Sequence, residues 1–282
     1  MRGFKAALLV GFGILAAGIS GAEAKDWTTV KIATEGAFRP WNFVEGGKLG
    51  GFDVELANEL CKRMNVTCEL MAQDWDGIIP ALQAGKYDAI MAAMTITPKR
   101  REVIAFSRTY AVGPHGFAVQ KASPLANLPG KGKSLSLTRD ADEAKKMIDG
   151  MRDMLKGKVV AAQVSTTDLA FLEKYFGDVA TVRSYKTTEQ HDLDLIAGRV
   201  DLIMTGVTAL NATIEQPGYE ALTLAGPTFT NDVFGEGTGV GLRKSDPELK
   251  VMFDKAINSM IADGSLKALH LKWFKMDNSP KD

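Results

Sequence analysis

Apolar and polar residues alternate along this chain with two different periods. Short apolar runs, typical of buried strands, are followed by segments whose apolar residues recur three and four positions apart, as in amphipathic helices. One such alternating set spans 29–95 and a second spans 157–208. The chain ends with two helical patterns, at 245–264 and 265–275. The alternation predicts an α/β fold in which mostly parallel sheets are flanked by helices.

The two alternating sets contain the same motif. The segment AGKYDAIMAAMT (84–95) aligns without gaps with AGRVDLIMTGVT (197–208). We interpret each copy as a helix end, a glycine turn and a buried strand. Because ligands of open α/β sheets bind at the carboxyl ends of strands, two domains built on this unit predict a ligand cleft between them. The stretch 121–137 between the sets is rich in Pro, Gly, Ser and Lys, and we expect it to be a loop.

The first residues have the pattern of an export signal. Arg2 and Lys5 form a basic region, 6–19 is an apolar run too short for a comfortable membrane span, and 22–24 reads Ala-Glu-Ala. We expect residues 1–24 to be a cleaved signal peptide, with an uncleaved anchor as the alternative. No cysteine stands at the cleavage site, so we expect no lipid anchor and a protein free in the periplasm.

The charge balance bounds the partners. The chain has 34 basic and 34 acidic residues, without a basic stripe that would favour nucleic acid.

Cys61 and Cys68 are its two cysteines, and in an oxidising compartment we expect them to form a disulfide. Asn65 between them is suited to the left-handed conformation that ends a helix. Neither the cysteine spacing nor a nearby histidine favours a metal, and we expect no metal and no cofactor.

An anion site is predicted after the first copy of the repeat. Thr97 is a good N-cap and Pro98 a good first residue of a helix, yet three cations follow at 99–101. Such charge is unfavourable at the positive end of a helix dipole unless an anion binds there. Backbone amides, the hydroxyls of Thr95 and Thr97, and the guanidinium of Arg100 together suit a carboxylate. A solvent-exposed helix face is the alternative, which we prefer for residues 99 and 101.

The second set offers a similar helix start. Its strand ends at Gln163 or Val164, and Ser165 or Thr166 then caps a helix. This would bring a second helix N-terminus to the cleft, although an ordinary N-cap is an equally good interpretation.

A cation site is predicted after the first strand. Glu35 follows that strand, and Phe38, Trp41 and Trp75 are close in sequence or in the order of a parallel sheet. Aromatic residues more often belong to a core, but a carboxylate beside aromatic faces suits a flat cation. The ligand expected from the residues is therefore a small zwitterion, with its anion at Arg100 and its cation at Glu35.

Four stretches carry a family resemblance over almost the whole mature chain. The polar-amino-acid periplasmic binding proteins of ABC importers, solute-binding protein family 3, are similar to GFDVELANELCKRMNVTCEL, DGIIPALQAGKYDAIMAAMTITPKRREVIAFS, QVSTT and GTGVGLRKSDPELK. The resemblance implies a two-lobed type II fold that closes on its ligand and acts as a monomeric receptor for a permease. Lobe 1 would comprise 25–116 and 226–282, and lobe 2 would comprise 117–225.

The resemblance also implies roles for single residues. Arg100 would bind the α-carboxylate of the ligand, helped by Thr95 and the Ala93 backbone, while Ser165 and Thr166 would contribute from lobe 2. The family disulfide corresponds to Cys61–Cys68.

One position departs from the pattern of the basic-amino-acid binders. These have an aspartate for the α-ammonium where this chain has Gly206. The chain resembles instead the opine-binding subgroup, whose ligands carry a carboxyalkyl group on that nitrogen. In this subgroup Glu35 and the aromatic positions would hold a guanidinium, and Gln163 the additional carboxylate. Phe38 stands where the subgroup often has Tyr, and Val164 replaces a family Gly.

The expected function is thus a receptor for an opine of the octopine or nopaline kind, or for a basic amino acid. Two alternatives remain: a periplasmic cyclohexadienyl dehydratase on the same fold, and a receptor that serves chemotaxis only. A dehydratase needs a general acid in the cleft. The three histidines, His115, His191 and His270, are scattered in the sequence. We therefore expect no catalytic residue and no enzyme.

Overall fold

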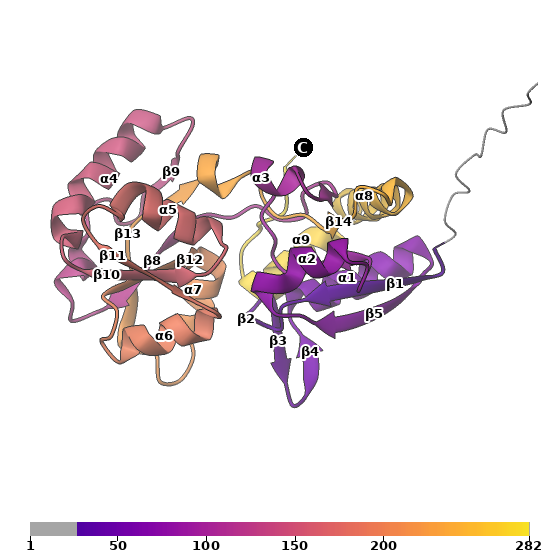
Figure 1. The fold of residues 1–282 in the computed structure, drawn as a ribbon, viewed down its shortest axis with the longest axis horizontal. Helices are drawn as coiled ribbons and strands as arrows, with labels where there is room; N and C mark the ends of the chain where they lie inside the picture. The colour runs from indigo at the N-terminus through magenta and orange to yellow at the C-terminus, as the bar shows by residue number, and fades with distance from the viewer. Residues whose placement is uncertain (1–26, 282) are drawn as a thin grey trace, which may run out of the picture.

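The computed structural model describes residues 27–281, so the predicted signal peptide lies outside the described residues. Two α/β lobes lie side by side, each with its own sheet and helices (Figure 1). The predicted two-lobed α/β architecture is confirmed. No helix of the described part is both long enough and apolar enough to cross a membrane.

Lobe 1 is built on a five-stranded sheet in the order β5-β1-β6-β14-β7. Its strands are β1 (Thr29–Thr34), β5 (Thr67–Ala72), β6 (Ala89–Ile90), β7 (Ala105–Phe106) and β14 (Gly241–Leu242). Its helices are α1 (Phe52–Met64), α2 (Ile78–Gln83), α3 (Pro98–Arg101), α8 (Pro247–Ala262) and α9 (Ser265–Phe274), with a 3₁₀ turn η1 (Trp75–Gly77). A small antiparallel sheet follows β1 and consists of β2 (Ala37–Phe38), β3 (Asn42–Glu45) and β4 (Lys48–Gly50).

Lobe 2 is built on a six-stranded sheet in the order β11-β10-β12-β8-β13-β9. Its strands are β8 (His115–Gln120), β9 (Ser134–Ser136), β10 (Val159–Gln163), β11 (Thr181–Tyr185), β12 (Leu202–Gly206) and β13 (Leu222–Thr230). Its helices are α4 (Ala141–Leu155), α5 (Thr167–Phe176), α6 (Thr188–Ile196) and α7 (Val207–Ile214), with 3₁₀ turns η2 (Pro124–Asn127) and η3 (Asp232–Phe234). The stretch expected to be a loop therefore contains β9, which pairs with β13 and buries Leu135.

The sheets are parallel where strand and helix alternate and antiparallel where the chain changes lobes. β1 pairs in parallel with β5 and β6, and β10 with β11 and β12. The crossing strands β8 and β13 run antiparallel to each other, and β14 runs antiparallel to β6. Because β8 begins at His115 and β13 continues to Thr230, the predicted boundaries after residues 116 and 225 cut through paired strands. The sheet of lobe 2 therefore extends from His115 to Thr230.

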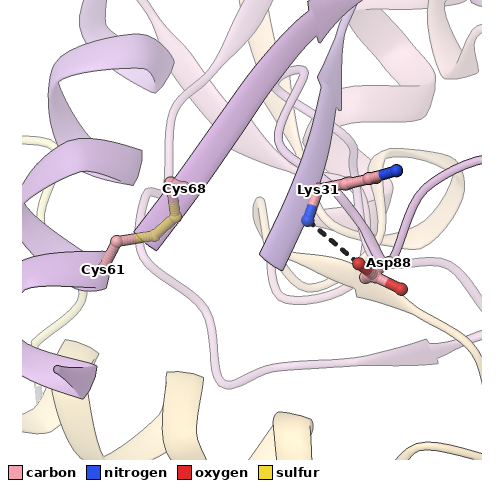
Figure 2. The surroundings of a disulfide bond; sticks show 4 residues. All are labelled: Lys31, Cys61, Cys68 and Asp88. Atoms are coloured by element: carbon pink, nitrogen blue, oxygen red, sulfur yellow. Dashed lines mark hydrogen bonds between the residues drawn. A yellow bond between two sulfur atoms is a disulfide. The ribbon is translucent and has the colours of Figure 1, made fainter. Parts of the chain in front are cut away.

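The internal repeat gives the same local structure in both lobes. Gly85 and Gly198 follow the ends of α2 and α6 in the left-handed region, with φ of 75° and 69°. The aspartate three residues later exchanges two hydrogen bonds with one residue of a neighbouring parallel strand. The Asp88 amide donates to the Lys31 carbonyl, and the Asp201 amide donates to the Val159 carbonyl, each at 2.8 Å. Asp88 Oδ2 accepts from the Lys31 amide at 2.9 Å (Figure 2), and Asp201 Oδ2 accepts from the Val159 amide at 2.8 Å. Each aspartate thus fixes the register of β6 or β12 at its amino end.

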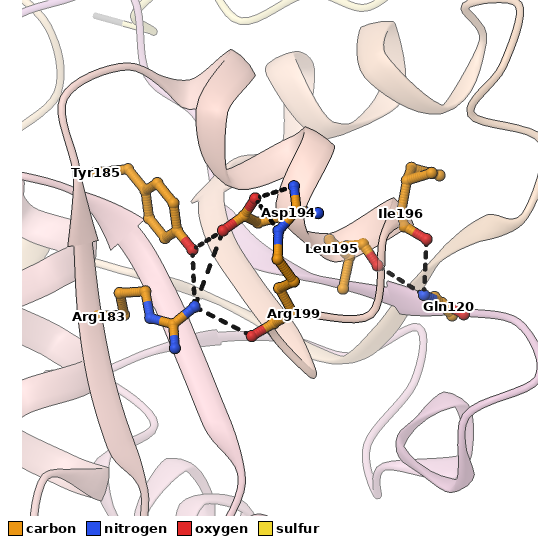
Figure 3. Close-up of polar contacts among 7 residues, drawn as sticks. All are labelled: Gln120, Arg183, Tyr185, Asp194, Leu195, Ile196 and Arg199. Atoms are coloured by element: carbon orange, nitrogen blue, oxygen red, sulfur yellow. Dashed lines mark hydrogen bonds and ion pairs between the residues drawn. The ribbon is translucent and has the colours of Figure 1, made fainter.

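Side-chain contacts hold the turn of the second copy. Gln120 Nε2 of β8 donates to the Leu195 and Ile196 carbonyls at the end of α6, at 2.6 and 3.2 Å (Figure 3). Asp194 accepts from Arg199 Nε at 2.7 Å in the same view. The bonds from Gln120 satisfy carbonyls at a helix end, and the bond from Arg199 ties the residue after the glycine turn to α6.

The disulfide joins the end of α1 to the start of β5. Asn65 ends the helix in the left-handed conformation, with φ of 56°, as predicted. Cys61 and Cys68 then form a disulfide, with Cα atoms 6.0 Å apart (Figure 2).

We expect replacement of both Cys61 and Cys68 by Ser to lower the free energy of unfolding by about 2.5 kcal/mol, because the unfolded chain regains the entropy of a short loop. Urea unfolding of the oxidised wild type and the double variant measures this difference. Alkylation without reductant, followed by mass spectrometry, should label neither cysteine of the exported wild type. Two labelled thiols would contradict the pairing.

Candidate functional site

A cavity lies between the lobes and is lined by residues of both. Ten of the predicted site residues line it: Glu35, Phe38, Trp41, Trp75, Ala93, Thr95, Arg100, Gln163, Thr166 and Gly206. Residues 35, 163 and 206 lie at the carboxyl ends of β1, β10 and β12, which meet at the cavity, as expected for open α/β sheets.

Ser165 and Thr97 are predicted site residues that do not line the cavity. The Thr97 hydroxyl is used as the N-cap of α3, so its predicted contact with the carboxylate is not seen. Ser165 contributes differently. It has a left-handed φ of 59°, and its carbonyl accepts from Arg100 Nη2 at 3.1 Å. Thr166, rather than Ser165, caps α5, since its hydroxyl accepts from the Leu169 amide at 3.1 Å. Ser165 therefore contributes backbone to the site and orients the arginine.

Arg100 lies at one side of the cavity on the short helix α3. Thr97 caps this helix by accepting from the Arg100 amide at 3.2 Å. The guanidinium donates to the Thr95 carbonyl at 2.8 Å and lies 5.2 Å from the centre of the Trp75 ring. Burial lowers the pKa of Arg100 to about 10, an effect that the charge of Asp168 opposes. The guanidinium stays charged at neutral pH and retains N–H groups for an anion.

The neighbouring cations have ordinary surroundings. Lys99 is exposed, and Arg101 forms a 2.7 Å ion pair with Glu236 at the surface. The interpretation of these two residues as a solvent-exposed face agrees with this placement.

Glu35 lies at a different part of the cavity, where it meets Gln163 from the opposite lobe. The side chains of Glu35 and Gln163 are 8% and 5% exposed, and Gln163 Nε2 donates to Glu35 Oε1. Gln163 also donates to the Lys186 carbonyl at 3.0 Å. Burial raises the pKa of Glu35 to about 7, although the bond from Gln163 acts against this rise. A cation entering the cavity would compensate the desolvated carboxylate.

The aromatic residues that line the cavity are held by both lobes. Trp75 Nε1 donates to the Val164 carbonyl at 3.0 Å, and Trp41 Nε1 donates to Thr208 Oγ1 at 3.0 Å. Lys186 and Asp74 add an ion pair of 2.6 Å between the lobes at the surface. These contacts close the lobes around the cavity in this structure.

Asp53 positions the Ala93 backbone and is a residue that the sequence analysis missed. Ala93 adopts a left-handed φ of 49°, which is unfavourable for a residue with a Cβ. Its amide donates to Asp53 Oδ2 at 2.9 Å, and Asn42 and Tyr110 donate to the same buried carboxylate, each at 2.9 Å. Acidic residues are common in the first turn of a helix, and Glu55 follows Asp53 in the same turn, so the sequence does not single out Asp53. Its contacts with Ala93 and Tyr110 span 40 and 57 positions.

The cavity also contains polar residues that sequence reasoning did not select. They are Thr167, Thr205, Thr208, Thr238, Asp168 and His115. Of the three histidines that are scattered in the sequence, His115 lines the cavity, because β8 begins there. Its Nδ1 lies 2.8 Å from Asp168 Oδ1. Their separation of 53 positions hides this pair from any local pattern.

Residues 27–281 contain no group of three or more His, Cys, Asp or Glu side chains placed to hold a metal ion. The polar groups of the cavity suit hydrogen bonding and ion pairing with an organic ligand.

We expect the ligand-free protein to lose stability as the pH rises from about 4.5 through 7. Glu35 has its raised pKa only in the folded state, so its contribution is complete below the unfolded pKa of about 4.5 and is lost as the folded carboxyl ionises. Glu35→Gln removes this loss and should be relatively more stable above pH 7, by up to roughly 3 kcal/mol.

Unfolding of the wild type and Glu35→Gln between pH 4 and 8.5 measures the effect. Glu45→Gln is the matched control, because the Glu45 side chain is 73% exposed. A stability difference between wild type and Glu35→Gln that does not change with pH would contradict the raised pKa.

Comparisons with known proteins agree with this arrangement. The model of the bacterial extracellular solute-binding proteins, family 3, matches residues 30–276. The chain is 45% identical to the octopine-binding periplasmic protein of Rhizobium meliloti, over 93% of this chain and 95% of that protein. It is 34% identical to the lysine/arginine/ornithine-binding periplasmic protein of Escherichia coli strain K12, over 87% of each.

Among solved structures, an ancestral arginine-binding protein bound to arginine matches with a TM-score of 0.73 and 31% identity. The match covers 88% of this chain and 98% of that one. Sequence, fold and cleft therefore lead to one conclusion: the chain belongs to family 3 of the bacterial extracellular solute-binding proteins.

Proposed function

We propose that this protein is a periplasmic receptor for an opine of the octopine or nopaline kind, and that it delivers this ligand to the permease of an ABC transporter. The observation that carries the proposal is the presence of Arg100 and Glu35 in one cavity between the lobes. A guanidinium and a buried carboxyl group together suit a ligand with a carboxylate and a cationic end.

The Arg100 part of the cavity suits the α-carboxylate. The Thr95 carbonyl of lobe 1 and the Ser165 carbonyl of lobe 2 both accept from the guanidinium, which fixes its position in the closed cavity. A positioned guanidinium can bind both oxygens of a carboxylate, which favours this anion over a single-point acceptor.

The Glu35 part suits a ligand guanidinium. Phe38, Trp41 and Trp75 line the same cavity and offer apolar ring faces to a flat cation. Gln163, which now bonds to Glu35, has an amide that is suited to an additional carboxylate once the ligand replaces that bond.

Gly206 supports an opine over its parent amino acid. A Cβ placed on Gly206 would have no neighbouring heavy atom closer than 4.0 Å, so there is open space beside the strand end. A carboxyalkyl group on the α-nitrogen needs such space. The relative named for octopine is also considerably more similar to this chain than the one named for lysine, arginine and ornithine.

The proposal includes a monomer, a cleaved signal peptide and no enzymatic activity. The dehydratase alternative is favoured by one observation, since His115 and the protonatable Glu35 both line the cavity and could act as a general acid. Incubation with cyclohexadienyl substrates tests it, and formation of an aromatic product would replace the receptor proposal.

A thermal-shift panel of octopine, nopaline, arginine, lysine, ornithine and histidine tests the ligand class. We expect the largest stabilisation from an opine, because binding to the native state raises the unfolding temperature. Tight binding of arginine without binding of octopine or nopaline would leave only an amino-acid receptor.

We expect Arg100→Ala to weaken binding by roughly 2–5 kcal/mol, because the ligand carboxylate would be buried without its charged partner. Calorimetry with the best ligand of the panel measures the loss. Arg101→Ala is the matched control, since Arg101 forms a surface ion pair with Glu236 and should bind almost normally. Near-normal affinity of Arg100→Ala would reject the carboxylate site.

We expect Gly206→Asp to reverse the preference between octopine and arginine. The new carboxylate would repel the additional carboxylate of the opine and attract a free α-ammonium. Gly206 has φ of −58°, so an aspartate can adopt the local backbone without left-handed strain.

Titration of both ligands against wild type and Gly206→Asp measures the preference, with Gly206→Ala as the control for side-chain volume. If Gly206→Asp weakens the binding of octopine and of arginine equally, Gly206 does not determine the ligand class.

A further inference from the structure

His115 and Asp168 form a pair in the cavity that the proposed function has not used. His115 Nδ1 lies 2.8 Å from Asp168 Oδ1, and both residues line the cavity. The side chains of His115 and Asp168 are only 16% and 8% exposed. A nearly buried carboxylate and imidazole are costly to desolvate unless they are paired. The hydrogen bond between them therefore stabilises both groups in the cavity wall.

The ring of His115 is fixed from two sides. Asp168 of α5 holds Nδ1, and the Phe234 ring stacks on the imidazole with centroids 4.3 Å apart and an interplanar angle of 15°. In the sheet, His115 is the register partner of Gly206. The imidazole is therefore a fixed group beside the open space at Gly206.

The chemistry of the pair determines what it can bind. A carboxylate accepts, so the hydrogen of a neutral imidazole lies on Nδ1 and points to Asp168. The second ring nitrogen, Nε2, then carries a lone pair and acts as an acceptor. An N–H group of a ligand is its natural partner.

The geometry of the cavity brings the pair close to the Arg100 guanidinium. Arg100 Nη2 donates to the Ser165 carbonyl at 3.1 Å, three residues before Asp168 at the start of α5, and Arg100, His115 and Asp168 all line the cavity. In an α-amino acid or an opine, the α-nitrogen is separated from the carboxylate by one carbon. A ligand whose carboxylate binds Arg100 therefore has its α-nitrogen close to the pair, while its side chain extends elsewhere in the cavity.

We propose that the His115–Asp168 pair binds the α-nitrogen of the ligand, with His115 Nε2 as the hydrogen-bond acceptor. This inference rests on the proposed function, because it requires the carboxylate at Arg100. Gly206 has no side chain that could accept a hydrogen bond. His115, on the neighbouring strand β8, supplies this acceptor instead. A ring acceptor held in place by a carboxylate suits a substituted ammonium, which has fewer N–H groups and more bulk than a free one.

The test removes the acceptor and the ligand nitrogen separately. His115→Phe retains a ring that can stack on Phe234, and octopine is compared with its ether analogue, in which oxygen replaces the imino nitrogen. We expect the variant to bind octopine about tenfold or more weakly, and to bind the ether with less than about a threefold change. Calorimetry, with competition for weak ligands, measures all four affinities. If octopine does not bind the wild type, arginine and its des-amino analogue replace the pair of ligands.

Asp168→Asn provides a second variant. Its amide can donate to Nδ1, which leaves the ring hydrogen on Nε2 and turns the acceptor into a donor. We expect this variant also to lose affinity for octopine while its affinity for the ether changes little. Equal losses for octopine and ether in both variants would show a merely structural pair and overturn the inference.

Nuclear magnetic resonance of the wild type keeps the inference testable if a variant does not fold. The chain has three histidines, and His191 and His270 are fully buried, so their ring signals serve as internal references. We expect octopine to shift the His115 Nε2 signal and the ether not to reproduce that shift. An unshifted His115 signal in the octopine complex would overturn the inference. Failure of the wild type to bind any panel ligand would instead reject the proposed function.

Discussion

The Asp53 carboxylate accepts three hydrogen bonds inside lobe 1, from Asn42, Tyr110 and the Ala93 amide. Asn42 in turn accepts from the Gly36 amide at 2.8 Å, next to Glu35. One buried carboxylate thus fixes the segment after β1 and the segment after β6 relative to α1. Because Glu35 and Ala93 lie on these two segments, the lobe 1 wall of the cavity depends on Asp53. Burial raises the pKa of Asp53 to about 7, so this centre is sensitive to the same pH range as Glu35.

The site residues that could be predicted from sequence have local signals. Thr97 and Pro98 predict the start of a helix, so Arg100 could be assigned to a helix N-terminus. The repeat predicted that a strand ends near Gly206. His115, Asp168 and Asp53 could not be found in this way. His115 and Asp168 are 53 positions apart, and the contact of Asp53 with the Ala93 amide spans 40 positions. The cap of α5 was open between Ser165 and Thr166, since both are good N-caps and the left-handed backbone of Ser165 decides between them.

The fold shows the same distinction between local and distant information. The two C-terminal helices and the strands β1 and β10 were predicted because period and flanking residues agree. β9 was missed because its three residues become a strand only by pairing with β13. The expected lobe boundaries after residues 116 and 225 fall within paired strands for a related reason: composition does not reveal that the crossing strands β8 and β13 pair with each other.

The two aspartates of the repeat separate the requirements of folding from those of recognition. Asp88 and Asp201 fix strand register at the amino ends of β6 and β12, whereas the ligand cavity lies at the opposite ends of these strands. Residues such as Ala93 and Gly206 can therefore change during evolution without a slip of the sheet that would turn buried side chains outward. Substitutions at the carboxyl ends of the strands can therefore change which nutrient is bound, while the pairing of the strands stays the same.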